Sequence, residues 1–198
     1  MGDSVVARAE INIAGRRSVS PAVRQGNMSN NEPDISVIKD EVLWLLIACF
    51  VMQRMDSDPG FKLETRWQIG DWLFARNTVF ESIVMRACRL DDDGSGIWSF
   101  REAQKRFNSI IKDQKRIQSI IGLIKQYRKD INSIKIYVRN NGLAHIPINA
   151  QEKIKEFSPT PMLQSACSIL DALMGERVNF TYSCGAYEKV DLRVHFNI

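Results

Sequence analysis

Apolar residues recur at intervals of three and four positions along this chain of 198 residues, and this periodicity constrains the fold more than any other feature. Such spacing places apolar side chains on one face of an α-helix. It predicts a first long helix over residues 34–55, with Asp34 or Ser36 as the N-cap and Pro59 and Gly60 beyond its end. The apolar positions of this helix are Ile35, Ile38, Val42, Leu45, Leu46 and Cys49.

The same periodicity predicts four more helices. They cover residues 63–90 with a break near Gly70, 99–114 with Ser99 as cap, 117–139, and a segment that begins at Pro159 and Pro161 and ends at Gly175. Short connections between helices favour antiparallel neighbours. The sequence therefore predicts an all-α fold, an antiparallel bundle of four to five helices.

The two ends of the chain have a different character. Residues 1–33 lack periodicity and are rich in Ser, Asn, Gly and Pro, which predicts a flexible N-terminal segment before a bundle domain over 34–176. In the tail, 177–198, apolar residues alternate on both sides of a turn at Gly185, so the pattern allows a short β-hairpin. The alternating positions are Val178, Phe180, Tyr182, Val190, Leu192, Val194 and Phe196.

Composition and charge narrow the class of protein. With 44% hydrophobic and 25% charged residues the chain can bury a core, and its longest uncharged apolar run, Val42–Met52, is shorter than the roughly 20 residues of a membrane span. Residues 1–24 contain no apolar core of a signal peptide. The four cysteines, Cys49, Cys88, Cys167 and Cys184, form no CxxC pair. We therefore expect a cytoplasmic protein with buried thiols and no membrane contact.

One short motif combines residue types that can do chemistry. His145 ends the string RNNGLAH, which begins at Arg139 where the most basic predicted helix stops. On an unbroken helix six residues turn through about 600°, which would leave Arg139 and His145 about 120° apart. A break at Asn141 or Gly142 would redirect the chain and let both side chains point toward one site.

RNNGLAH resembles the Arg-polar-x4-His motif of the HEPN superfamily, whose members are small helical bundles of toxin, abortive-infection and RNA-processing systems. The segment from Phe80 to Phe100, with ESIVMRACRLDDD, is similar to the helix that precedes the motif in the abortive-infection U-type branch. The resemblance covers about residues 36–175. It implies a metal-independent endoribonuclease without a cofactor, whose site forms where two protomers bring their motifs together. It also implies phage defence or a toxin–antitoxin system, with an antitoxin as a further partner.

The residue types suit this chemistry. Metal-free RNA cleavage needs a base that removes the proton of the 2′-OH, and the pKa of histidine, near 6.5, makes His145 the candidate. The guanidinium of Arg139 offers a bidentate fork to the charge that develops on phosphorus. Asn140 could orient the phosphate or the imidazole, and a second His145 from a partner subunit could protonate the leaving 5′-oxygen. Glu81 is a candidate acidic helper from the second helix.

The distribution of charge favours an anionic partner more than the total does. Residues 101–139 carry a net +8, whereas the whole chain carries +4. A basic face beside the motif would hold RNA phosphates. The candidate RNA-binding residues are Lys125, Arg128, Lys129 and Lys135. The alternative is a solvated helix face without a ligand.

Two further interpretations stay open. Arg and His near a helix end commonly cap carbonyls, so the chain could be a catalytically inactive helical module that binds RNA, nucleotide or a partner protein.

The string DDDGSGIWSFRE also matches much of an EF-hand loop, with Asp91, Asp93, Ser95 and Glu102 as calcium ligands. Trp98 at position 8 and the lack of a second such loop argue against calcium. The alternative is a connection in which Ser99 begins the next helix.

Other residues with chemical potential are assigned to structure. Trp44, Trp67, Trp72, Phe74 and Phe80 lie at helical spacing and are predicted to belong to the core rather than to a base-stacking platform. His195 is expected to be part of the tail. The chain lacks HExxH, GxxxxGK and GxSxG, which excludes zinc proteases of that type, P-loop enzymes and serine hydrolases with a nucleophile elbow.

Overall fold

The structure is a computed structural model of the chain. It describes residues 35–57, 65–94, 96–109, 112–140, 158–184 and 188–198, and within them the side chains of 137–140, 184 and 188 are not described. The candidate calcium ligand Ser95 and the candidate base His145 lie outside the described residues, as does the predicted flexible segment 1–33.

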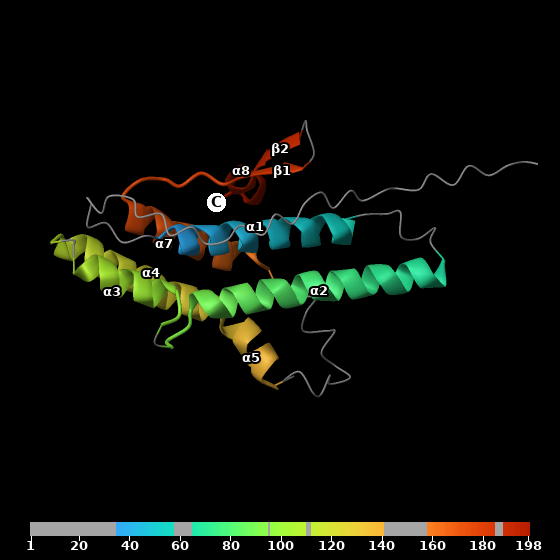
Figure 1. Cartoon of the computed structure of the whole chain (residues 1–198), viewed down its shortest axis with the longest axis horizontal. Helices are drawn as coiled ribbons and strands as arrows, with labels where there is room; N and C mark the ends of the chain where they lie inside the picture. The colour runs from blue at the N-terminus through green and yellow to red at the C-terminus, as the bar shows by residue number, and fades with distance from the viewer. Residues whose placement is uncertain (1–34, 58–64, 95, 110–111, 141–157, 185–187) are drawn as a thin grey trace, which may run out of the picture. The chain divides into compact units, whose positions relative to one another are not determined.

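Helices and one small hairpin make up the described chain (Figure 1), which confirms the predicted all-α fold with a C-terminal hairpin. The elements are α1 (Ser36–Ser57), α2 (Arg66–Leu90), α3 (Phe100–Asn108), α4 (Gln114–Asp130), α5 (Asn132–Asn140), α7 (Thr160–Met174), β1 (Thr181–Cys184), β2 (Glu188–Asp191) and α8 (Leu192–Phe196). Within the described residues, no helix combines the length and hydrophobicity that a bilayer crossing requires.

Helices α1 and α2 run side by side in opposite directions (Figure 1). At one end Glu41 accepts hydrogen bonds from Arg86 at 2.7 Å and from Arg89 at 2.8 Å. At the other end Asp56 pairs with Arg76 at 2.6 Å. The buried faces of the two helices join one hydrophobic core with α3, α4 and α7. The shared core confirms what the apolar periodicity predicted, and the antiparallel packing of α1 and α2 confirms what the short connections predicted.

Helix α2 begins with a capping box and continues without the break predicted near Gly70. The hydroxyl of Thr65 accepts from the amide of Gln68 at 3.4 Å, and the side chain of Gln68 accepts from the amide of Thr65 at 2.9 Å. A glycine inside a helix lowers its stability without necessarily ending it. The prediction of a break was therefore wrong, since the rest of α2 supplies the missing stability.

Helix α7 packs on α4. At the C-terminus of α7, one arginine of α4 hydrogen-bonds the backbone of α7. Arg116 donates from Nε to the carbonyl of Ala172 at 2.7 Å and from a terminal nitrogen to that of Leu173 at 2.8 Å. The helix ends at Gly175, whose φ of 80° lies in the left-handed region that favours glycine. These bonds satisfy carbonyl groups that a helix end leaves without intrahelical partners.

The region predicted as one helix over 117–139 is two helices that meet at Ile131. Ile131 and Ile134 are both buried, so the apolar pattern continues across the junction and conceals it. At the junction Asp130 accepts hydrogen bonds from Gln126 and from the hydroxyl of Ser165. Helix α3 also ends earlier than predicted, at Asn108.

The tail contains the hairpin but not its full predicted extent. Strands β1 and β2 pair antiparallel with Tyr182 opposite Val190. The second run of alternating residues then becomes the short helix α8, because the carboxylate of Asp191 accepts from the amides of Arg193 and Val194 as an N-cap. His195 of α8 is exposed, bonds Gln53 at 2.9 Å and packs edge-on against Phe50.

The core assignment of the aromatic residues was wrong for three of five. Phe80 is buried, but Trp67 and Phe74 on α2 are 86% and 75% exposed, and Trp44 on α1 is more than half exposed. Helical spacing alone cannot distinguish a buried stripe from an exposed one, since both repeat with the same period. The described free thiols follow the prediction better, because Cys49 and Cys167 are buried and Cys88 is half-buried.

Candidate nucleic-acid interface

The predicted catalytic motif lies at the end of α5. Arg139 and Asn140 are the last two residues of this helix, although the structure does not describe their side chains. His145 belongs to the segment 141–157, outside the described residues. The meeting of Arg139 with His145 therefore stays a prediction, and the described part of the site consists of the elements that lead to the motif.

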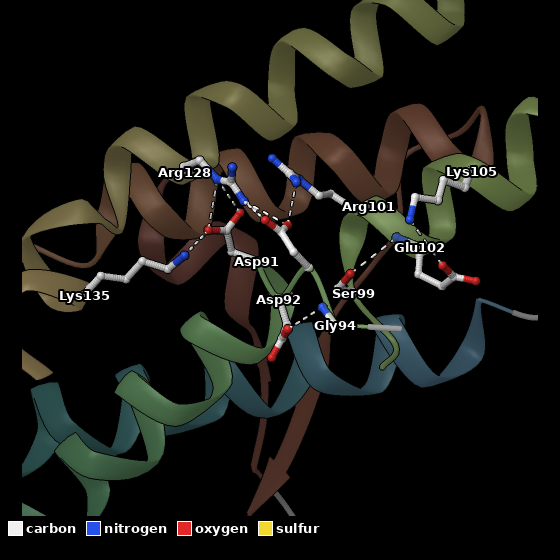
Figure 2. A network of polar contacts seen from close by, with 10 residues as sticks. Asp91, Asp92, Gly94, Ser99, Arg101, Glu102, Lys105, Arg128 and Lys135 are labelled. Carbon is white, nitrogen blue, oxygen red and sulfur yellow. Dashed lines mark hydrogen bonds and ion pairs between the residues drawn. The ribbon is translucent and has the colours of Figure 1, made fainter. Parts of the chain in front are cut away.

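A buried carboxylate joins α5 to the helices around it. Asp91 forms the C-cap of α2, and its side chain is fully buried. It accepts hydrogen bonds from Nε of Arg128 on α4 at 3.0 and 3.2 Å, and it also accepts one from the ammonium of Lys135 on α5. Figure 2 shows Asp91 between these two cations. One anion thus fixes the relation of three helices.

Asp93 extends this network toward α3. Its carboxylate accepts from a terminal nitrogen of Arg128 at 3.1 Å and pairs with Arg101, the second residue of α3, at 2.6 Å. Burial lowers the pKa of Arg128, but hydrogen bonds and charge from Asp91 and Asp93 outweigh this effect and the pKa is raised. The guanidinium therefore keeps its charge within the network.

The four candidate RNA-binding residues fall into two groups. Arg128 and Lys135 are engaged by Asp91, so part of their charge is neutralised inside the protein. Lys125 and Lys129 are exposed, and neither has a hydrogen bond or ion pair with any residue that the structure describes. They lie four positions apart, so they project from the same side of α4. Within the described part of the chain, no carboxylate neutralises these two ammonium groups.

The described residues of the candidate calcium loop are arranged as a helix connection. Asp91 and Asp93 face cations, and Glu102 pairs with Arg106 at 3.1 Å. Ser99 caps α3 by accepting from the amide of Glu102, as the alternative predicted. In the part of the chain that the structure describes, no three His, Cys, Asp or Glu residues gather where they could hold a metal ion.

The candidate acidic helper Glu81 lies on an exposed position of α2. It is seven residues before Cys88, hence on nearly the same face of the helix. Burial raises the pKa of the Cys88 thiol, the nearby Lys135 lowers it, and Asp91 and Asp92 raise it further. Helix α5 packs against α2, which brings Lys135 near Cys88. Whether Glu81 meets the motif stays a prediction.

Sequence reasoning missed the network centred on Asp91. The acidic run after α2 is visible in the sequence, but the partners of Asp91, Arg128 and Lys135, lie 37 and 44 residues further along the chain. The one available signal was an unusual excess of carboxylates directly at a predicted helix end, where the helix dipole disfavours them. An acid in that position requires nearby cations, although nothing in the sequence says which ones.

Comparison of the chain with protein-family models, with curated proteins and with solved structures gives no match.

Proposed function

We propose that this protein is a HEPN-like, metal-independent endoribonuclease that acts as a homodimer in phage defence or a toxin–antitoxin system, with an antitoxin or another protein as a further partner. One observation supports this proposal most. The string that resembles the HEPN motif begins on α5, and an ion pair between Lys135 of this helix and the buried carboxylate of Asp91 attaches it to the end of α2. A nuclease site needs its phosphate-binding cation on a firmly held element.

The proposed reaction is attack of the 2′-oxygen on the adjacent phosphorus. His145 removes the proton of the 2′-OH, and the guanidinium of Arg139 stabilises the negative charge that develops on the phosphoryl oxygens. The bond from phosphorus to the 5′-oxygen breaks, and a second His145 from the partner subunit supplies the proton to that oxygen. Asn140 orients the phosphate. The products are a 2′,3′-cyclic phosphate and a 5′-hydroxyl end.

Lys125 and Lys129 hold the RNA backbone in this proposal. Both are exposed and free of partners among the described residues, and they lie on the helix that leads into α5. Each phosphate contact releases condensed counterions, so affinity falls as salt rises. Glu81 acts as an acidic helper from α2. The other two basic residues, Arg128 and Lys135, contribute mainly by keeping α4 and α5 in place.

The decisive test compares the two histidines of the chain. We expect His145→Ala to abolish cleavage of a single-stranded RNA in EDTA, while His195→Ala, which changes an exposed residue of α8, leaves cleavage intact. The parent protein should produce cyclic-phosphate ends. Equal cleavage by the His145→Ala variant and the parent would remove the proposed base.

The second candidate function is a catalytically inactive module that binds RNA. The free lysine pair on α4 favours it, because phosphate binding needs no histidine. Salt-sensitive binding of RNA by a parent protein that never cleaves it, with binding unchanged in His145→Ala, would select this function over the nuclease.

A further inference from the structure

We infer that a pocket at the C-terminal end of α7 binds a phosphate group, either as free inorganic phosphate or on a small phosphomonoester. The pocket has a volume of about 520 Å³, a size typical of sites for small molecules. Its walls come from the end of α7 and the residues that follow it, from the first turn of α4 and from α8. The charged residues that line it are Arg116, Asp171, Glu176, Arg177 and Arg193.

Arg193 is the buried cation of this pocket, since only 4% of the residue is exposed. One of its terminal nitrogens donates to the carboxylate of Asp171 at 2.5 Å, and its Cζ lies 5.6 Å from the ring centroid of Phe180. Its Nε is buried and has no hydrogen-bond partner among the described residues. A buried charged donor without an acceptor is costly and uncommon, so it points to a ligand that completes the site.

Arg116 is held at the pocket by the backbone of α7. Its hydrogen bonds to the carbonyls of Ala172 and Leu173 fix the plane of the guanidinium, and its second terminal nitrogen has no partner among the residues described. A Cβ at Gly175 would come within 3.0 Å of this guanidinium, so the glycine leaves room for it. Donors that are fixed before a ligand arrives lower the entropic cost of binding.

Arg177 adds a third guanidinium at the exposed rim. It donates to the carbonyl of Ile198 at 3.1 Å, and the amide of Ile198 donates to the carbonyl of Arg193 at 3.0 Å, so Ile198 links Arg177 to α8. Among the described residues that line the pocket, three guanidinium groups accompany two carboxylates, and Asp171 is already paired with Arg193. An excess of forked arginine donors suits the charge and geometry of a phosphate.

The pocket is separate from the motif of the proposed nuclease. Helix α4 has 17 residues, a length of about 25 Å. Arg116 lies in its first turn, whereas α5 follows its last residue. The inference therefore does not depend on the nuclease proposal, because it involves neither α5 nor the lysines of α4.

The test is calorimetric titration of the full chain with inorganic phosphate and, separately, with glycerol 3-phosphate, at about pH 7.5, where a phosphate ester is largely dianionic. We expect saturable binding with a dissociation constant below about 1 mM for at least one titrant. Tighter binding of the ester identifies a phosphomonoester as the ligand class. Equal or tighter binding of inorganic phosphate identifies the free ion.

Two exposed residues of the rim give opposite predictions. Arg177→Gln removes a charged donor and should weaken binding about tenfold, whereas Glu176→Gln removes a repelling carboxylate and should strengthen it about threefold. Arg66→Gln, which changes an exposed arginine of α2 without a partner among the described residues, is the matched control and should leave the affinity unchanged.

A buried variant and a map of the binding site complete the test. Arg193→Lys keeps a positive charge beside Asp171 but removes Nε, so it should also weaken binding about tenfold, and circular dichroism melts check that it folds. Phosphate should slow amide hydrogen exchange in residues 171–178 and 192–198 but not in α5. Lack of saturable binding of both titrants at about 10 mM overturns the inference. Unchanged affinity in Arg177→Gln also overturns it, as does protection confined to α5, and neither result removes the nuclease proposal.

Discussion

The carboxylate of Asp91, at the end of α2, accepts two hydrogen bonds from Nε of Arg128 on α4, with its own side chain fully buried. A buried charge is costly unless a partner of opposite sign accompanies it. Here the cost is offset by two cations that come from helices distant in sequence. The contacts of Asp91 with Arg128 and Lys135 therefore specify the position of α2 relative to α4 and α5 more than they add stability.

Replacement of Asp91 should reveal this arrangement. Asp91→Asn leaves Arg128 and Lys135 without their shared anion, and we expect the free energy of unfolding to fall by about 2 kcal/mol, less than for a fully buried pair because both cations are partly exposed. Urea titration measures the change. Asp92→Asn is the control, since among the described residues its side chain accepts a hydrogen bond only from the amide of Gly94. Equal losses in the two variants would contradict the role of Asp91.

The ion pair to Lys135 makes a separate prediction for α5. Lys135→Met keeps the aliphatic stem but removes the ammonium, so α5 should loosen while α4, still held by Arg128, should not. We expect faster amide hydrogen exchange in residues 132–140 and unchanged exchange in 114–130. Lys129→Met, an exposed lysine on α4, is the matched control. Uniform change across both helices would contradict a local anchor.

The free lysines of α4 should govern binding of RNA. In Lys125→Ala with Lys129→Ala, two phosphate contacts are lost, so the plot of log affinity against log salt should become shallower by about 1.4 for a single strand. Filter binding at several salt concentrations measures this slope. A double change of Lys112 and Lys115 to Ala removes the same charge at exposed positions near the start of α4. An equal effect there would mean that total charge, not the Lys125–Lys129 face, sets binding.

The helices were predictable because their apolar residues mark buried faces directly. Val42 and Leu45 on α1 and Leu170 on α7 are fully buried, as the spacing predicted. Failures occurred where a local contact overrode the pattern. The cap formed by Asp191 turned an alternating segment into α8, and the continuous burial of Ile131 and Ile134 hid the junction between α4 and α5.

The candidate site was predictable only in its residue types. The basic character of 101–139 can be read from the sequence, but which cations are free cannot, because that depends on carboxylates brought close by the fold. Arg128 and Lys129 are neighbours in sequence, yet Asp91 holds the first, while the second has no partner among the described residues. The two side chains point about 100° apart around α4, and this difference in direction decides which of them meets Asp91.

The buried thiols predict how stability changes in alkaline solution. Burial raises the pKa of Cys167 to about 12 from an ordinary value of 9.0, and burial also raises that of Cys49. Above pH 9 the unfolded chain releases these protons while the folded chain retains them. The stabilising contribution of the two thiols is therefore complete below pH 9 and is lost as pH rises toward 12.

In this window each thiol lowers the free energy of unfolding by about 1.4 kcal/mol per pH unit. We expect the free energy of unfolding to fall by about 3 kcal/mol between pH 8 and pH 10, measured by urea titration. Replacement of both residues by alanine should lower stability at pH 8 but flatten the alkaline decline, whereas an unchanged decline would show that the thiols are not its cause.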